Sequence, residues 1–328
     1  MDKSIPKKFL LATRVSDVTD ALEALEQAAT VAWRPVGNND NNLAVIGLGS
    51  DPAAGVVERI TNAIDAVLDQ EWLQKGQPAH ISSPRAAVEA WFGIKGGRLS
   101  SLSGQDLRKL EDLSSKVQVT LRDSDRPDKP TIDIRDEGTG LLAEEFADTI
   151  LSLNKNRKLR KLFLAGAFGQ GGSTALTYSL YTLIFSRKAV LSAKANPLAF
   201  AIVRFNPGDA NVDKHGVYEY LVDRANGHPF AFDVPLDEFR TGTLVRHVAM
   251  DLAKYAAVMT APTGSLWFLA HNYLFDPVMP FRIEEARSGK NAATRTVGGN
   301  NRLLTLAANT EYQRDANLTF KDGSVSVK

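Results

Sequence analysis

Apolar residues recur along the chain with two periods, one typical of helices and one typical of strands. Residues 16–30 carry apolar side chains on one helical face, and Ser16 is the expected N-cap. Residues 31–36 predict a short strand, and residues 43–46 predict another after an asparagine-rich turn. The N-terminal part of the chain is therefore expected to contain one helix and two strands.

The next helix combines an apolar face with a conspicuous polar stripe. Ser50 and Asp51 are residue types that cap helices, and a proline follows them, so a helix is expected to start there. Glu58, Asn62 and Asp65 lie at i, i+4 and i+7, so they share one face. The opposite face is apolar and would pack on a sheet; it carries Val57, Ile60, Ile64 and Val67. Alone, this pattern also suits an ordinary amphipathic helix with a solvated polar side.

Residues 70–115 predict a helical insertion after this helix. One helix is expected from Ser83–Pro84 to Phe92, and another from Ser103 to Leu113, with a Gly-Gly pair between them. The sequence does not say what this insertion contacts.

An alternating pattern follows the insertion. Residues 117–122 and 131–135 predict a β-hairpin, and residues 142–153 predict a helix with acidic residues at its start. Residues 154–161 form the most basic run of the chain. Such a run is commonly a solvated surface loop.

The C-terminal half alternates less regularly. Strands are expected at 181–186, 199–205, 217–223 and 243–248, then a helix at 264–275 and a strand at 280–285. Runs of strands and helices packed on one sheet face imply an α+β fold, a two-layer sandwich of helices on a mixed sheet. Residues 286–328 turn polar and glycine-rich and close with a hairpin at Lys321-Asp322-Gly323. They resemble the start of a β-rich second domain, so we expect a longer native chain or a protein partner.

Composition narrows the function classes only in part. Among 328 residues, 39 Lys and Arg against 38 Asp and Glu give a formal net charge of +1, so overall charge leaves a nucleic-acid partner open. The absence of cysteine excludes disulfides, thiolate metal sites and a cysteine nucleophile. No signal peptide or membrane-length apolar run is recognised, so a cytoplasmic protein is expected.

Three further motifs carry candidate chemistry. Asp136-Glu-Gly-Thr-Gly140 directly follows an alternating strand. Gly166-Ala-Phe-Gly-Gln-Gly171 runs into Gly172 and is expected to open a helix. Thr241-Gly-Thr-Leu-Val-Arg-His247 forms a later strand. Each motif is weak alone, because short glycine patterns are common in turns.

Together with the Glu58 helix, these motifs resemble in order and context the GHKL ATPase superfamily. This superfamily includes DNA gyrase, the ninety-kilodalton heat-shock chaperones, sensor histidine kinases, mismatch-repair MutL proteins and MORC proteins. The resemblance covers roughly residues 10–285 and is greatest to the chaperone- and MORC-type proteins. It implies a Bergerat-type ATP-binding domain over residues 1–285.

The resemblance also implies roles for individual residues. Glu58 would be the general base and Asn62 the ligand of Mg²⁺. Asp136 would accept a hydrogen bond from the adenine amino group, and Thr243 would complete the adenine end. Asp65 either holds the adenine-side loop or caps the polar face of its helix. Two glycines would let the backbone approach the base and adopt positive φ, namely Gly138 and Gly140.

The glycine-rich loop resembles a phosphate cradle built from backbone N–H groups, aided by the helix start that follows. Its candidate nucleotide-binding residues are Gly166, Phe168, Gly169, Gln170, Gly171 and Gly172. The basic run lies where this superfamily has its ATP lid, so Lys155 or Lys158 is expected to reach a phosphate.

We therefore expect a magnesium-dependent ATPase that acts as a slow conformational clamp. ATP would promote a homodimer in which residues 1–35 reach toward the other subunit. The alternatives are a non-catalytic nucleotide-sensing module and the ATPase part of a DNA-processing or defence complex. A histidine kinase is disfavoured because none of the five histidines stands in a phosphoacceptor motif.

Overall fold

The computed structural model describes most of the chain. The described residues are 4–47, 51–78, 80–153, 161–166, 171–189, 196–209, 216–255, 259–261, 263–306, 316–320 and 323–327. Lys155, Lys158, Phe168, Gly169 and Gln170 lie outside these ranges.

A mixed sheet of ten strands organises the described residues. Across the sheet the order is β1 (Val31–Pro35), β6 (Val217–Asp223), β5 (Leu198–Asn206), β4 (Tyr181–Arg187), β8 (Gly242–Val248), β3 (Thr131–Asp136), β2 (Val117–Arg122), β9 (Phe281–Glu285) and β10 (Ala293–Val297), and β7 (Phe230–Phe232) pairs with β5. The pairs are antiparallel except for β2 with β9, which is parallel.

One sheet face packs against a long helix. Helix α4 (Pro52–Gln74) covers β2 and β3 together with the insertion helices α5 (Pro84–Phe92) and α6 (Leu107–Ser114) and with α8 (Leu266–Tyr273). Near β4 and β5 the same face is covered by α3 (Leu43–Ile46), η5 (Ala143–Asp148) and η7 (Ala175–Tyr178), the last directly after α7 (Gly171–Thr174). Helix α9 (Asn300–Thr305) lies beside η3 (Leu99–Ser101). The other short 3-10 turns are η1 (Val36–Asn38), η2 (Lys95–Gly97), η4 (Gly104–Asp106) and η8 (Ala253–Tyr255).

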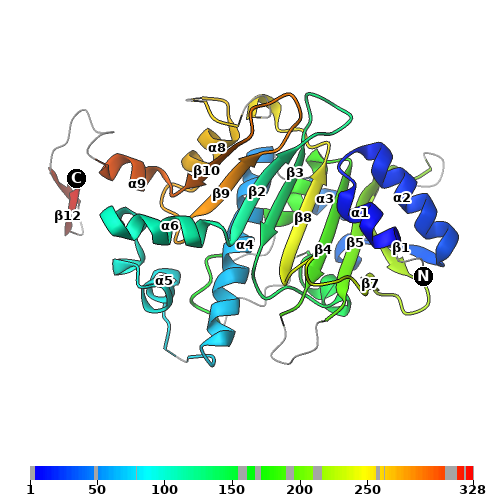
Figure 1. Ribbon diagram of the computed structural model, residues 1–328, viewed down its shortest axis with the longest axis horizontal. Coiled ribbons are helices and arrows are strands. Elements are labelled where there is room, and N and C mark those ends of the chain that lie inside the picture. Colours follow the sequence, from blue (N-terminus) through cyan, green and yellow to red (C-terminus); the bar gives the residue numbers. More distant parts are fainter. Residues whose placement is uncertain are drawn as a thin grey trace.

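The opposite face is covered by α1 (Ser4–Leu11) and α2 (Val15–Ala28). Phe9 is fully buried and packs against Phe200 of β5, with ring centroids 4.5 Å apart and the rings tilted by 35°. Figure 1 shows these two helices near the β1 end of the sheet, whereas α5, α6, α8 and α9 gather at the other end. The α+β class is therefore confirmed, with a mixed sheet and one face lined by α4. Helices α1 and α2 add a partial third layer that the two-layer expectation did not include.

Many expected elements form within one or two residues of the predicted bounds. The strands predicted at 117–122, 131–135, 181–186, 199–205, 217–223, 243–248 and 280–285 all form. Asp51 caps α4 by accepting the Ala53 N–H at 2.9 Å, and Ser83 caps α5 by accepting the Ala86 N–H at 3.1 Å. The C-terminal hairpin also forms, with β11 (Ala316–Phe320) paired to β12 (Gly323–Val327).

Residues 43–46 are helical, so the strand predicted there is wrong. The preceding Asn42 is fully buried, and its amide donates to the carbonyls of Val36 and Tyr218 and accepts the Tyr218 N–H. These side-chain bonds occupy backbone groups of β6 that a pairing strand would use. A four-residue apolar run has no period that separates helix from strand.

Two further predictions were wrong in detail. Helix α2 begins at Val15, not after Ser16, because Asp125 of the β2–β3 turn accepts the N–H groups of Val15 and Ser16, each at 3.2 Å. The helix expected at 142–153 is reduced to η5, since the Leu151 N–H bonds back to the carbonyl of the fully buried Phe146. Elements α1, β7, β10 and α9 were not predicted. Strand β10 pairs with β9, so the main sheet extends to Val297.

Candidate functional site

The polar stripe of α4 faces the chain that leads to the glycine-rich loop. Glu58 and Asn62 are half-buried, whereas Asp65 is buried, with 1% of its surface exposed. Oδ1 of Asp65 accepts the Ala165 N–H at 2.7 Å, and Oδ2 accepts the Gly166 N–H at 2.9 Å. Asp65 is therefore a backbone anchor and does not simply cap a solvated face.

Asp136 ends β3 on the α4 side of the sheet. Its Oδ1 accepts the Gly138 N–H at 2.8 Å and the Thr243 N–H at 3.2 Å. Among the described residues no hydrogen bond reaches its other oxygen, Oδ2. Burial raises the pKa of Asp136 to about 6, although the Arg135 charge and the two N–H donors oppose this shift. The carboxylate is thus ionised at neutral pH in a site with 5% exposure.

Gly138 and Gly140 follow Asp136 in the chain, and each lies in close contact with the backbone of another element. A Cβ on Gly138 would overlap the backbone of Ala66 in α4, and the Thr139 N–H donates to the Ala66 carbonyl at 3.2 Å. Gly140 has φ +60°, as expected, and a Cβ there would overlap the Arg187 carbonyl of β4. The φ of Gly138 is not positive, so close approach to α4 explains this glycine.

Thr243 lies beside Asp136 because β8 neighbours β3 in the sheet. Its Oγ1 is 2.9 Å from Oγ of Ser186 on β4. The Ser186 hydroxyl in turn accepts the Leu141 N–H at 2.8 Å. The strand ends and the turn after β3 are therefore joined by a small polar network.

Arg135 organises the approach to Thr243 and was not predicted. Its guanidinium donates to the carbonyls of Arg240, Thr241 and Thr243, at 3.1, 2.7 and 3.2 Å, and also to the Asp136 carbonyl. Its guanidinium carbon, Cζ, lies over the Phe239 ring, 4.4 Å from the ring centroid. An arginine in an alternating strand carries no sequence signal for this role, because three of its acceptors are about a hundred residues away.

The glycine-rich loop meets α4 at both of its described ends. Gly166 is held by Asp65, and Gly171 and Gly172 begin α7. A Cβ on Gly55 of α4 would lie 2.8 Å from the Ala175 nitrogen, so the two elements are in close contact. The helix expected after the loop is short. It is α7, which has 4 residues, and the chain then continues as η7.

Two buried histidines lie outside this constellation. His271 is 3% exposed, and its Nδ1 is 2.9 Å from the Trp267 carbonyl, as expected for a satisfied core histidine. His247 on β8 is fully buried, and its Nδ1 is 3.0 Å from Thr182 Oγ1. Burial and the nearby Arg59 charge hold the pKa of His247 well below its usual value, so its imidazole is neutral.

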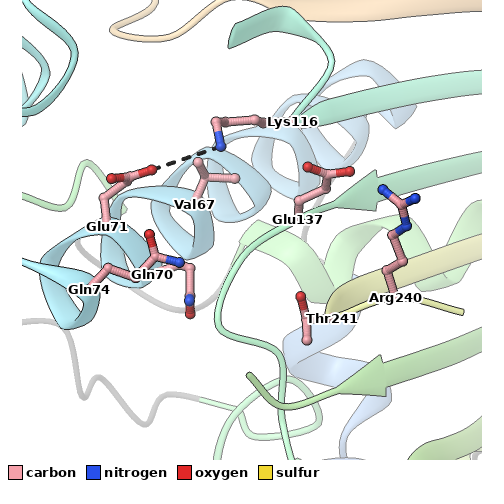
Figure 2. A pocket seen from close by; sticks show the side chains of 8 residues that line it. All are labelled: Val67, Gln70, Glu71, Gln74, Lys116, Glu137, Arg240 and Thr241. Carbon is pink, nitrogen blue, oxygen red and sulfur yellow. Dashed lines mark ion pairs between the residues drawn. The ribbon is translucent and has the colours of Figure 1, made fainter. Parts of the chain in front are cut away.

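A polar cavity of about 200 Å³ lies beside Asp136, but none of the predicted ligands lines it. Figure 2 shows it between the C-terminal half of α4 and the residues Glu137, Arg240 and Thr241. Lys116 and Glu71 lie at its edge, and Lys116 Nζ is 3.8 Å from Glu71 Oε1. The complete lining is Val67, Gln70, Glu71, Gln74, Lys116, Glu137, Arg240 and Thr241. The stripe face of α4, with Glu58 and Asn62, points away from this cavity.

The structure thus brings together two groups of predicted residues. Asp136, Gly138, Gly140 and Thr243 form one group; Asp65 and Gly166 form the other, with α4 contacting both. Within the described ranges, no group of three or more His, Cys, Asp or Glu side chains could hold a metal ion. None of the helices in that part of the chain is long and apolar enough to span a bilayer.

A scan of the chain against protein-family models finds no match, and a search of curated proteins finds no relative.

Proposed function

We propose that this chain is a GHKL-type ATPase with a Bergerat-type fold, which binds ATP between α4 and the glycine-rich loop. The observation that carries the proposal is the convergence of separate motifs. Asp136 and Thr243 are hydrogen-bonded although 107 positions apart, and Gly138 packs on the same α4 that carries Glu58 and Asn62. Chance motifs in unrelated turns have no reason to meet around one helix.

The adenine end of the site is Asp136. Its Oδ1 is occupied by two backbone donors, so Oδ2 is the acceptor for the adenine amino group. Thr243 lies beside it and contributes its hydroxyl, directly or through a water. The rigidity of this end supports specific recognition, because Asp136 is fixed by strand pairing on one side and by Gly138 on the other.

The phosphate end is the glycine-rich loop. Gly166, Gly171 and Gly172 bound it in the described residues, and Phe168, Gly169, Gln170 and Lys155 belong to the parts outside them. Because α7 is short, we assign phosphate binding to backbone N–H groups of the loop and not to a helix dipole.

Glu58 and Asn62 are the hydrolytic pair. Both are half-buried and one turn apart on α4, so a carboxylate and an amide oxygen lie side by side. An amide oxygen suits Mg²⁺, which takes one or two protein oxygens and, when bound, neutralises phosphate charge. Glu58 accepts the proton of the water whose oxygen bonds to the γ-phosphorus as ADP leaves.

Glu58→Ala tests the enzyme. We expect ATP affinity within about twofold of wild type and a loss of turnover of about 10²–10⁴-fold. Calorimetry measures the affinity and phosphate release measures the turnover, with Glu144→Ala, an exposed acid in η5, as the matched control. A wild-type chain that binds ATP but shows no magnesium-dependent turnover at any concentration would instead be a nucleotide-sensing module.

We also propose that ATP promotes a homodimer. In the described structure α1 and α2 pack on their own sheet, and Arg246 Nη1 donates to the carbonyls of Leu10 and Ala12, both at 2.8 Å. Deleting residues 1–30 would uncover this core, so light scattering of the intact chain with a non-hydrolysable ATP analogue is the suitable test. A mass that stays monomeric at every concentration excludes the clamp.

A further inference from the structure

The polar stripe of α4 continues beyond its motif. Glu58, Asn62 and Asp65 are followed on the same helical face by Asp69 and Trp72. The last three of these residues all contact the short segment 161–166, which directly precedes the glycine-rich loop. One helix face therefore carries both the proposed hydrolytic pair and a clamp for the neighbouring chain.

The polar half of this clamp is modest in energy. Lys161 Nζ lies 2.5 Å from Asp69 Oδ1 and 4.8 Å from the centre of the Trp72 ring. The Lys161 and Asp69 side chains remain 30% and 21% exposed, and such pairs contribute little in water. The bonds to Ala165 and Gly166 come from the buried Asp65, but they require the segment to be in place already.

The apolar half holds the segment in place. Phe163 is 4% exposed and lies between two tryptophans, with ring centroids 5.4 Å from Trp72 at 34° and 5.4 Å from Trp91 at 73°. The edge-on geometry with Trp91 is a favourable arrangement for aromatic pairs. The segment itself has little structure beyond one turn, closed by the Leu164 N–H on the Lys161 carbonyl at 3.0 Å. Its position therefore depends on these side-chain contacts.

Trp91 belongs to α5, in the helical insertion. The sequence did not indicate what this insertion contacts. Ala87 and Val88 of α5 are fully buried in the same apolar core as α4, so the tryptophan is presented by a firmly packed helix. Trp72 is fixed in turn by its Nε1–H, which donates to the Pro78 carbonyl at 3.2 Å. Both walls around Phe163 are thus rigid.

We propose that Trp91 is a positioning residue: it wedges Phe163 against Trp72 and so fixes Gly166, where the glycine-rich loop begins. The positioning of Gly166 stands on the described contacts alone, whereas its effect on nucleotide binding rests on the proposed function. The insertion is then a structural support of the phosphate end and has no part in the adenine end, where Asp136 and Thr243 are held by the sheet.

Hydrogen exchange without nucleotide tests the positioning. In Trp91→Ala, exchange at the Ala165 and Gly166 N–H groups should speed up about tenfold, because losing an aromatic contact of this kind loosens the segment. Trp33→Ala is the matched control, since Trp33 lies on β1 at the other end of the sheet and stacks with Arg204. Trp91→Phe keeps an aromatic ring and should restore slow exchange. If Trp91→Ala fails to fold, Trp91→Leu takes its place, because leucine fills much of the space but has no ring.

Calorimetry with two ligands then tests the link to the site. ATP affinity should fall about five- to tenfold in Trp91→Ala, while adenosine affinity stays unchanged because adenosine lacks the phosphates. Unchanged exchange at Ala165 and Gly166 in folded Trp91→Ala, or in Trp91→Leu where that variant replaces it, overturns the inference, as does an equal loss of adenosine and ATP affinity. If exchange speeds up in Trp91→Ala but the wild-type protein binds no ATP, the positioning role of Trp91 stands and the proposed function is rejected.

Discussion

The backbone N–H of Thr243 donates to Oδ1 of Asp136 over 3.2 Å, which joins two motifs that are 107 positions apart. Neighbouring strands bring them together, since Arg135 of β3 pairs with Leu244 of β8. The carboxylate is thereby placed at a buried strand end where the backbone supplies donors but burial opposes its charge. Such a group is costly to the fold, and the proposed function gives it a role as the acceptor for a ligand.

Asp136→Asn should separate stability from binding. The amide oxygen can accept the same two N–H groups, but the amide nitrogen would face the adenine amino group, a donor against a donor. We expect no measurable ATP binding by calorimetry, together with a free energy of unfolding at pH 7 that is equal or higher by about 1–3 kcal/mol.

The matched control is Asp237→Asn, which makes the same change at an exposed aspartate. It should alter neither quantity. Unchanged ATP affinity in Asp136→Asn would reject Asp136 as the adenine acceptor.

The raised pKa of Asp136 also predicts a pH dependence of stability. Its folded pKa of about 6 exceeds the ordinary 3.8, so the folded state binds the proton more tightly than the unfolded state. The stabilisation from this group is present below about pH 4 and is lost as the pH rises through 6. The stability of wild type relative to Asp136→Asn should therefore fall by about 2 kcal/mol between pH 4 and pH 7.

Urea unfolding of both proteins across this range measures that difference, because the other titrating groups are shared and cancel. If the difference in free energy of unfolding does not change with pH, or if it grows in favour of wild type as the pH rises, the pKa of Asp136 is not raised in the folded state.

Gly138→Ala should destabilise the fold by about 1–3 kcal/mol, because the added methyl group overlaps the Ala66 backbone of α4. Gly289→Ala is the comparison: Gly289 has φ +75° and no heavy atom within 4 Å of an added Cβ. Its cost is limited to backbone strain of about 1 kcal/mol. Thermal unfolding of the two variants decides, and an equal or smaller loss for Gly138→Ala would exclude the close contact with α4.

Asp133→Ala should cost about 3–5 kcal/mol, because it leaves the buried Arg246 without its carboxylate. Asp133 accepts from Arg246 Nε and Nη2 at 2.6 and 2.8 Å and from Arg122 Nε at 2.6 Å. The exposed pair of Lys109 and Asp106 is the control, and Asp106→Ala should change the free energy of unfolding by less than about 0.5 kcal/mol. Similar losses in both variants would mean that Arg246 finds another partner.

Local signals predicted those parts of the fold whose causes are local. The cap at Asp51, the cap at Ser83 and the alternating strands need only neighbouring residues, and they formed as expected. Two of the failures have distant causes. Asn42 bonds to Tyr218, and Asp125 completes the start of α2 from the β2–β3 turn.

The residues of the candidate site divide in the same way, into those that a local motif marks and those whose contacts are distant in the chain. The motifs carried the residues Glu58, Asn62, Asp136 and Thr243, because spacing and order are visible in one dimension. Arg135 and Trp91 were missed, since their roles come from carbonyls and rings that only the fold brings near. Supporting residues of this kind have no fixed spacing from the groups that they hold.

The strand order has a consequence for synthesis on the ribosome. Strand β8 lies between β4 and β3 and follows both in the chain, so the two halves of the sheet stay unjoined until residue 248 has left the exit tunnel. Asp136 meets Thr243 in that same event. A nascent chain shorter than this has α4 and the hairpin but not the contact between Asp136 and Thr243. Under the proposed function, nucleotide could therefore bind only to chains that have closed the sheet.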